Sequence, residues 1–155
     1  MPHAEHRYTT TTTWTGNSGT GTSHHTAYSR DHVIAVEGKA EIAGSSDPSF
    51  RGDPARHNPE DLLVASLSAC HMLWFLVLAA KARIVVTGYV DRAEGIMEEA
   101  SDGGGYFTSV VLRPEITLAP GNDSVKADNL HHPAHELCFI SRSVNFPVTV
   151  EATYK

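Results

Sequence analysis

The longest apolar segment of the chain covers residues 62–80 and contains no formal charge. Asn58 before it is a favourable helix N-cap, and Pro59 suits the first helical position. Two acidic residues, Glu60 and Asp61, follow at the positive end of the helix dipole. The pattern therefore predicts a helix that begins at Pro59 and ends near Ala82.

A helix that is apolar on all sides is either buried in protein or embedded in a membrane. The length of segment 62–80 is close to the minimum for a membrane span. However, the segment contains Ser66, Ser68 and His71, and strand-like sequence flanks it on both sides. We therefore expect a buried core helix and no membrane association. Because one small domain covers such a helix poorly on every side, we also expect a homodimer that packs two copies together.

The remaining hydrophobic pattern predicts strands with a second helical region between the last two. β-Branched, aromatic or alternating residues mark the expected strands at 8–16, 23–37, 84–100, 106–119 and 144–154. A second helical region is expected at 124–141, with a kink or a junction of two short helices at Pro133. We expect Pro114 to mark a bulge or an edge position. The order ββ-α-ββ-α-β predicts an α+β fold.

Length and charge exclude several classes of protein. The 155 residues are enough for one domain with its own core, so we expect a single domain over 1–155. Twelve basic and eighteen acidic residues give a net charge of −6, which argues against binding to nucleic acid or to an anionic membrane surface. The polar N-terminus lacks the apolar core of a signal peptide, so we expect a cytoplasmic protein.

The chain has two cysteines, Cys70 and Cys138. Two are too few for a secreted disulfide scaffold, and neither belongs to a CxxC pair. The ordinary interpretation is two buried small apolar residues. The alternatives are a redox pair or a metal site. Both residues fall on predicted helices, which would hold a reacting pair in fixed positions.

A metal site is the competing hypothesis from another class. His131, His135 and Cys138 have spacings of four and three residues, so they could share one helical face and bind a divalent metal. Pro133 lies between them and disturbs a regular helix. No second ligand cluster accompanies them, so a metal-binding role is the weaker prediction.

Three short motifs carry a resemblance to a known family. They are Asn58-Pro-Glu60, Ser-Ala-Cys70 ten residues later, and Ala134-His-Glu-Leu-Cys138 before the last strand. Together they resemble the osmotically inducible protein C and organic hydroperoxide resistance (OsmC/Ohr) superfamily, and are closer to its OsmC-like branch. The resemblance implies an intertwined homodimer in which antiparallel sheets wrap long central helices.

The resemblance also implies a thiol-dependent peroxidase that reduces organic hydroperoxides without a metal or other cofactor. Cys70 would attack the peroxide as a thiolate and become a sulfenic acid. Cys138 would resolve it as a disulfide, which an external dithiol reductant would open. The alternative within the same fold is a binding module without peroxidase activity.

In this superfamily an arginine oriented by a glutamate activates the cysteine, and Glu60 matches that glutamate. Ten residues of straight helix separate Glu60 from Cys70 by roughly 15 Å. Either the helix bends between them or Glu60 acts on Cys70 of a partner subunit. The expected first hairpin turn, residues 17–21, lacks the superfamily's arginine. The candidates are Arg30 and Arg51, followed by Arg56.

Overall fold

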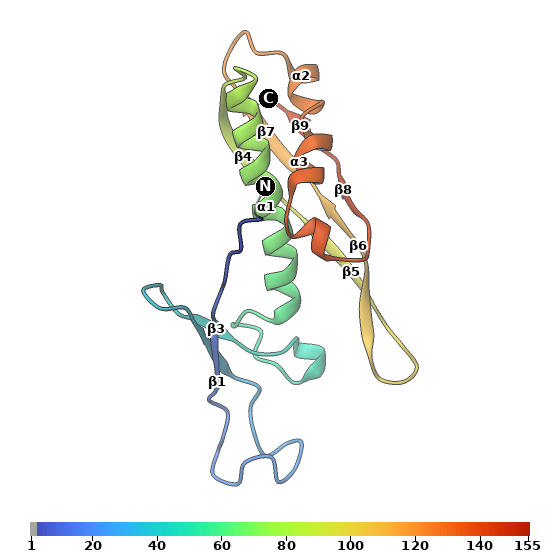
Figure 1. Ribbon diagram of the computed structural model, residues 1–155. Coiled ribbons are helices and arrows are strands. Elements are labelled where there is room, and N and C mark those ends of the chain that lie inside the picture. The colour runs from blue at the N-terminus through green and yellow to red at the C-terminus, as the bar shows by residue number, and fades with distance from the viewer. Residues whose placement is uncertain (1–2) are drawn as a thin grey trace. The chain divides into compact units, whose positions relative to one another are not determined.

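The computed structural model describes residues 3–155, which divide into two compact units at residues 62 and 63. Each unit is described by itself. Both contain strands and helical segments (Figure 1), and the α+β class predicted from the sequence is confirmed.

The first unit contains an antiparallel three-stranded sheet in the order β1-β2-β3. Its strands are β1 (Thr11–Trp14), β2 (His32–Ala35) and β3 (Ile42–Gly44), followed by the 3-10 helix η1 (Pro48–Phe50). The first two strands are much shorter than predicted, because turns and bends occupy much of residues 15–31. Strand β3 was not predicted, since three residues are too few to show an alternating pattern.

Gly44 leaves room for the side chain of His32 where β2 pairs with β3. In the register His32 lies opposite Gly44. A β-carbon at Gly44 would lie 2.3 Å from Nε2 of His32. The histidine ring therefore occupies the space that any larger residue would need.

Helix α1 (Pro59–Lys81) begins with the cap predicted from the sequence. Oδ1 of Asn58 accepts the backbone N–H of Asp61 at 2.8 Å, and Oδ2 of Asp61 accepts the backbone N–H of Asn58 at 3.3 Å. The two side chains therefore satisfy each other's amide groups at the helix start. At the other end Arg83 adopts a left-handed φ of 58°, which terminates the helix.

In the second unit the predicted long hairpin is divided into two pairs of strands. Three-stranded sheets form in the orders β4-β7-β9 and β5-β6-β8. Short strands at the C-terminus pair in parallel with β7 and β6. The bounds are β4 (Val86–Asp91), β5 (Glu94–Glu99), β6 (Gly105–Leu112), β7 (Pro114–Leu118), β8 (Val148–Val150) and β9 (Thr153–Tyr154).

Pro114 is the first residue of the central strand β7, so the predicted edge or bulge position is wrong. A proline is tolerated at a strand start because its missing N–H is not needed there. Opposite it, Asp91 joins the hairpin to α1: Oδ1 accepts the backbone N–H of Arg113 at 2.6 Å, and the hydroxyl of Ser68 donates to Oδ2.

The second helical region consists of α2 (Ser124–Asp128), α3 (His131–Leu137) and the 3-10 helix η2 (Ser141–Ser143). Two short helices were among the alternatives predicted, but the break falls at residues 129–130 and not at Pro133. Pro133 lies in the first turn of α3, where a backbone N–H has no partner within the helix.

Helix α1 buries one narrow stripe against two apolar clusters of the second unit. The buried positions recur every fourth residue: Leu67, His71, Phe75 and Ala79. Between them Leu73 is 60% exposed and Val77 is 45% exposed in the single chain. The 23-residue helix is long and apolar enough to span a membrane, a test that core helices of soluble proteins also meet.

Replacing Asp91 with alanine should destabilise the fold by about 1–3 kcal/mol, because the amide of Arg113 and the hydroxyl of Ser68 lose their acceptor. Urea denaturation measures the loss. Glu98, exposed on β5, provides the matched control, and Glu98→Ala should change stability by less than about 0.5 kcal/mol. Equal effects of the two substitutions would contradict the role given to Asp91.

Candidate functional site

The structure brings the two cysteines of the chain together in the second unit. Cys70 lies on α1 and is partly buried, whereas Cys138 ends α3 and is fully buried. The Cys138 side chain is near enough to Cys70 to raise the pKa of the Cys70 thiol. Both cysteines are free, and 68 residues separate them in the sequence. The fold therefore places two reduced cysteines near each other, one on α1 and one at the end of α3.

The surroundings of Cys70 favour the neutral thiol over the thiolate. Burial is the largest influence and raises the pKa of Cys70, and the Cys138 side chain raises it further. The backbone N–H groups of Ile140 and Phe139 act in the opposite direction and lower this pKa. Within residues 63–155, no lysine or arginine is among the groups that shift it. A reactive thiolate therefore requires a compensating cation, and none is among these groups.

A pair of buried histidines joins α1 to α3 in the same unit. Nε2 of His71 is 2.9 Å from Nδ1 of His131, and the side chains are 2% and 7% exposed. The ring of Phe75 stacks on the ring of His131 with centroids 4.4 Å apart. The polar contact that the structure shows for His71 is therefore with α3 of the same chain.

The histidine pair continues to the surface through two more side chains. Nε2 of His131 is 3.1 Å from the hydroxyl of Tyr154, which donates to Oδ1 of Asp128 at 3.2 Å. Burial lowers the pKa of His71 to about 4, with neighbouring His131 and His135 acting in the same direction. Burial also lowers the pKa of His131. Both rings are therefore neutral at pH 7.

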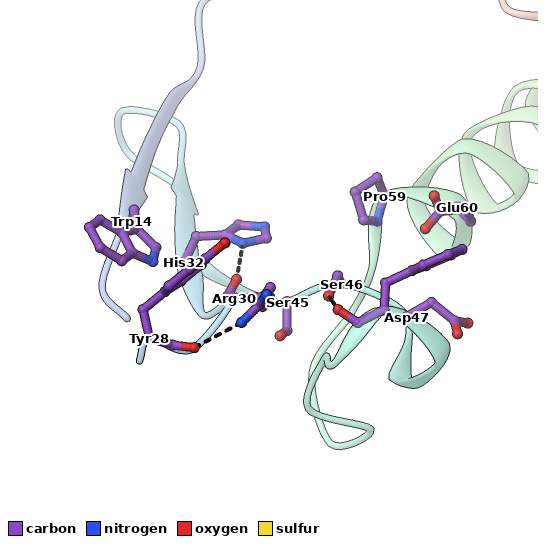
Figure 2. Close-up of a pocket in the computed structure, with 10 residues that line it drawn as sticks. Trp14, Tyr28, Arg30, His32, Ser45, Ser46, Asp47, Pro59 and Glu60 are labelled. Atoms are coloured by element: carbon purple, nitrogen blue, oxygen red, sulfur yellow. Dashed lines mark hydrogen bonds between the residues drawn. The ribbon is translucent and has the colours of Figure 1, made fainter. Parts of the chain in front are cut away.

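A cavity of about 310 Å³ lies in the first unit and contains two of the predicted site residues, Arg30 and Glu60 (Figure 2). Three aromatic side chains and several polar ones line it. They are Trp14, Tyr28, Arg30, His32, Ser45, Ser46, Asp47, Phe50, Pro59 and Glu60. The sequence did not single out the aromatic residues, because they come from separate strands and loops.

Two backbone oxygens and an aromatic ring hold the guanidinium group of Arg30. One terminal nitrogen donates to the carbonyls of His25 and Tyr28 at 2.8 and 2.9 Å. The guanidinium carbon lies 4.2 Å from the centre of the Tyr28 ring. These contacts fix a positive charge at the cavity without an acidic partner among residues 3–62.

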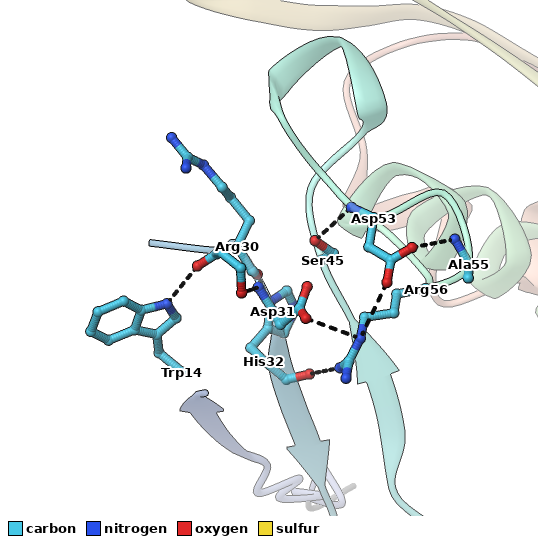
Figure 3. Close-up of polar contacts among 9 residues, drawn as sticks. Trp14, Arg30, Asp31, His32, Ser45, Asp53, Ala55 and Arg56 are labelled. Carbon is cyan, nitrogen blue, oxygen red and sulfur yellow. Dashed lines mark hydrogen bonds and ion pairs between the residues drawn. The ribbon is translucent and has the colours of Figure 1, made fainter. Parts of the chain in front are cut away.

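The other two candidate arginines have different surroundings. Arg56 is engaged with Asp31 at 3.5 Å, with Asp53 at 3.9 Å and with the carbonyl of His32 at 3.3 Å (Figure 3). Arg51 is exposed, follows η1 with a left-handed φ of 66°, and is not among the residues lining the cavity. Of the three arginines, Arg30 alone lines the cavity with Glu60.

The metal-site hypothesis has no support in the structure. No group of three or more His, Cys, Asp or Glu side chains within residues 3–155 is arranged to hold a metal ion. Of the proposed ligands, His131 has both ring nitrogens within hydrogen-bonding distance of His71 and Tyr154. Neither nitrogen is therefore free for coordination.

Comparison with known proteins identifies the family. The family model described as OsmC-like protein matches residues 52–153. The chain belongs to the OsmC-like family. An OsmC-like protein of unknown function from Vibrio cholerae O1 biovar eltor is 35% identical, with a TM-score of 0.86 over 96% of this chain and 100% of that one. The predicted OsmC-like fold is therefore confirmed. No curated protein matches the sequence.

More distant solved structures share the fold. An organic hydroperoxide resistance protein from Elizabethkingia anophelis is 22% identical with a TM-score of 0.67, covering 98% of this chain and 99% of that one. Another from Legionella pneumophila is 20% identical with a TM-score of 0.68, covering 97% and 99%. These likenesses show that the chain shares its fold with organic hydroperoxide resistance proteins.

The buried histidines predict a stability that falls as the pH falls. His71 has a pKa of about 4 in the folded chain and an ordinary value of 6.5, so between these values the unfolded chain binds the additional proton. From pH 7 to pH 5 this should remove about 2 kcal/mol of stability. Urea denaturation at the two pH values should show a smaller loss for His71→Gln. An identical loss would contradict this assignment.

Proposed function

We propose that this protein is a thiol-dependent peroxidase that reduces organic hydroperoxides, with Cys70 as the peroxidatic cysteine and Cys138 as the resolving cysteine. The observation that supports this most directly is the closeness of the two free cysteines, since the Cys138 side chain raises the pKa of the Cys70 thiol. In an OsmC-like chain, two neighbouring cysteines have a simpler explanation as a redox pair than as separate core residues.

The proposed reaction needs no cofactor. The Cys70 thiolate attacks the outer oxygen of the hydroperoxide, the O–O bond breaks, and the alkoxide takes up a proton and leaves as an alcohol. Cys70 is then a sulfenic acid. The thiol of Cys138 attacks that sulfur, the S–S bond forms and water leaves. An external dithiol reductant returns both cysteines to thiols by exchange and is itself oxidised to a disulfide.

The first step requires a cation near Cys70, because burial raises the pKa of this thiol. We assign this role to Arg30, with Glu60 as its orienting carboxylate, because both side chains line one cavity of the first unit. Arg51 becomes the weaker candidate, since it does not line that cavity. The same cavity contains Trp14, Tyr28 and Phe50, whose rings would contact the organic part of a hydroperoxide.

We further propose that the chain acts as a cytoplasmic homodimer and that residues 1–155 form a single OsmC-like domain within it. The uncovered side of α1, with Leu73 and Val77 exposed, is the apolar surface that a second copy would cover. The helix assignment is continuous from Pro59 to Lys81, without a break between Glu60 and Cys70. This favours the alternative in which Glu60 acts on Cys70 of a partner subunit.

Treatment of the reduced protein with cumene hydroperoxide should convert both thiols into one Cys70–Cys138 disulfide. Thiol titration and peptide mass spectrometry measure the product. Cys70→Ser should abolish peroxide consumption, whereas Cys138→Ser should accumulate a sulfenic acid that dimedone traps. Two free thiols per chain after excess peroxide would overturn the proposal and favour the alternative of a binding module.

Arg30→Met and Glu60→Gln should slow sulfenic acid formation by about 10- to 1,000-fold at pH 7, because a cation next to a thiol lowers its pKa by 1–3 units. Stopped-flow kinetics measures this step, and a higher pH should restore part of the rate by forming the thiolate. Arg51→Met is the matched control and should stay within about twofold of the wild type. If Arg51→Met lost the rate and Arg30→Met kept it, the assignment would be reversed.

A further inference from the structure

Helix α3 has few means of holding its own position. It is seven residues long, and its N-cap, Leu130, provides no side-chain hydrogen bond. Such a short helix is unstable by itself, so its place depends on packing against other elements. Its buried positions are His131 and Ala134, followed by Cys138 as the residue that ends the helix. These three share one face through their spacing of three and four residues.

The two ends of this face contact adjacent residues of α1, the helix beside α3 in Figure 1. At the N-terminal end His131 pairs with His71 at 2.9 Å and stacks on Phe75. At the C-terminal end the Cys138 side chain is near enough to Cys70 to raise the pKa of that thiol, and the Cys138 sulfur accepts the backbone N–H of Ser141 at 3.4 Å. The position of one end of α3 therefore constrains the other.

The hydrogen-bond chain fixes which nitrogen of each histidine carries the hydrogen. The Asp128 carboxylate only accepts, so the hydroxyl hydrogen of Tyr154 goes to it. The Tyr154 oxygen then accepts from Nε2–H of His131. Nδ1 of His131 is left as an acceptor and receives Nε2–H of His71. With both histidines neutral, every link from α1 through α3 and β9 to α2 has one donor and one acceptor.

We propose that the His71–His131 pair is a positioning device that holds α3 against α1 and thereby keeps the Cys138 thiol beside Cys70 for disulfide formation. The two histidines do not react. The two histidines raise the effective concentration of the Cys138 thiol at Cys70. Tyr154 and Asp128 keep His131 in the tautomer whose Nδ1 accepts the hydrogen bond from His71. This inference rests on the proposed pairing of Cys70 with Cys138 as a redox couple.

Replacing only one histidine of the His71–His131 pair with an apolar residue should disturb the packing of α3 on α1. If His131 became leucine, the Nε2–H of His71 would stay buried without an acceptor, which costs more than the hydrogen bond itself contributes. The chain would relieve that cost by moving α3 away from α1 and admitting water. The Cys138 thiol would move with it, because Cys138 ends the same short helix.

Equilibration with a mixture of reduced and oxidised glutathione at pH 7 tests the proposal without any peroxide. In this exchange the two thiols form one disulfide while glutathione disulfide becomes two glutathione molecules, so the equilibrium constant reports the effective concentration of the thiols. His131→Leu should lower this constant by about 5- to 100-fold. His131→Asn, which retains an acceptor near the position of Nδ1, should lower it less.

His132→Leu is the matched control, because its side chain is 81% exposed on the same helix and should leave the constant unchanged. Tyr154→Phe, a variant that removes only the hydroxyl, should lower the constant about two- to tenfold. If His131→Leu fails to fold, the equilibrium constant of Tyr154→Phe still tests the proposal. Unchanged constants in folded His131→Leu and Tyr154→Phe would overturn the proposal.

Peroxide kinetics separates a positioning role from general destabilisation. In His131→Asn, the rate of sulfenic acid formation at Cys70 should match that of the wild type, whereas conversion of the sulfenic acid to the disulfide should be slower. Equal slowing of both steps would contradict the proposal. A disulfide that forms with glutathione but not with peroxide would refute the peroxidase function and leave the positioning role intact.

Discussion

Helix α1 has more apolar surface than one copy of the chain covers, and the rest of the structure depends on this constraint. Only every fourth residue, from Leu67 to Ala79, is fully buried within the chain. The stripe meets two apolar clusters, one formed with β7, α2 and α3, and one formed with β6. The uncovered remainder is the physical argument for a homodimer, because such a surface is costly to leave in water.

The same burial determines the chemistry available to Cys70. An apolar setting protects a thiol from indiscriminate reaction, but it also favours the neutral form that is a poor nucleophile. The second unit offers Cys70 two backbone N–H groups and no cationic side chain among the groups that shift its pKa. The first unit fixes a guanidinium group at a cavity that also contains a carboxylate.

Much of the fold could be predicted because its signals are local. The predicted cap at Asn58 and the predicted helix start at Pro59 were correct, and the predicted helix end near Ala82 was one residue too late. Errors arose where several weak patterns competed. Pro133 was expected at a kink or at the junction of two helices, but a first turn tolerates proline, and the break lies three to four residues earlier. Strand β3 was missed because a three-residue strand has no period to detect.

The sequence by itself determined the α+β class, the apolar core helix, the family motifs and the two cysteines as candidates for chemistry. Those features depend on residues within a few positions of one another. The resemblance implied the pairing of Cys70 with Cys138, whereas only the tertiary structure decided that His71 meets His131 and that Arg30 shares a cavity with Glu60. Between 30 and 60 residues separate the members of the latter two pairs. Their contacts depend on how helices and strands pack, and no local pattern records that packing.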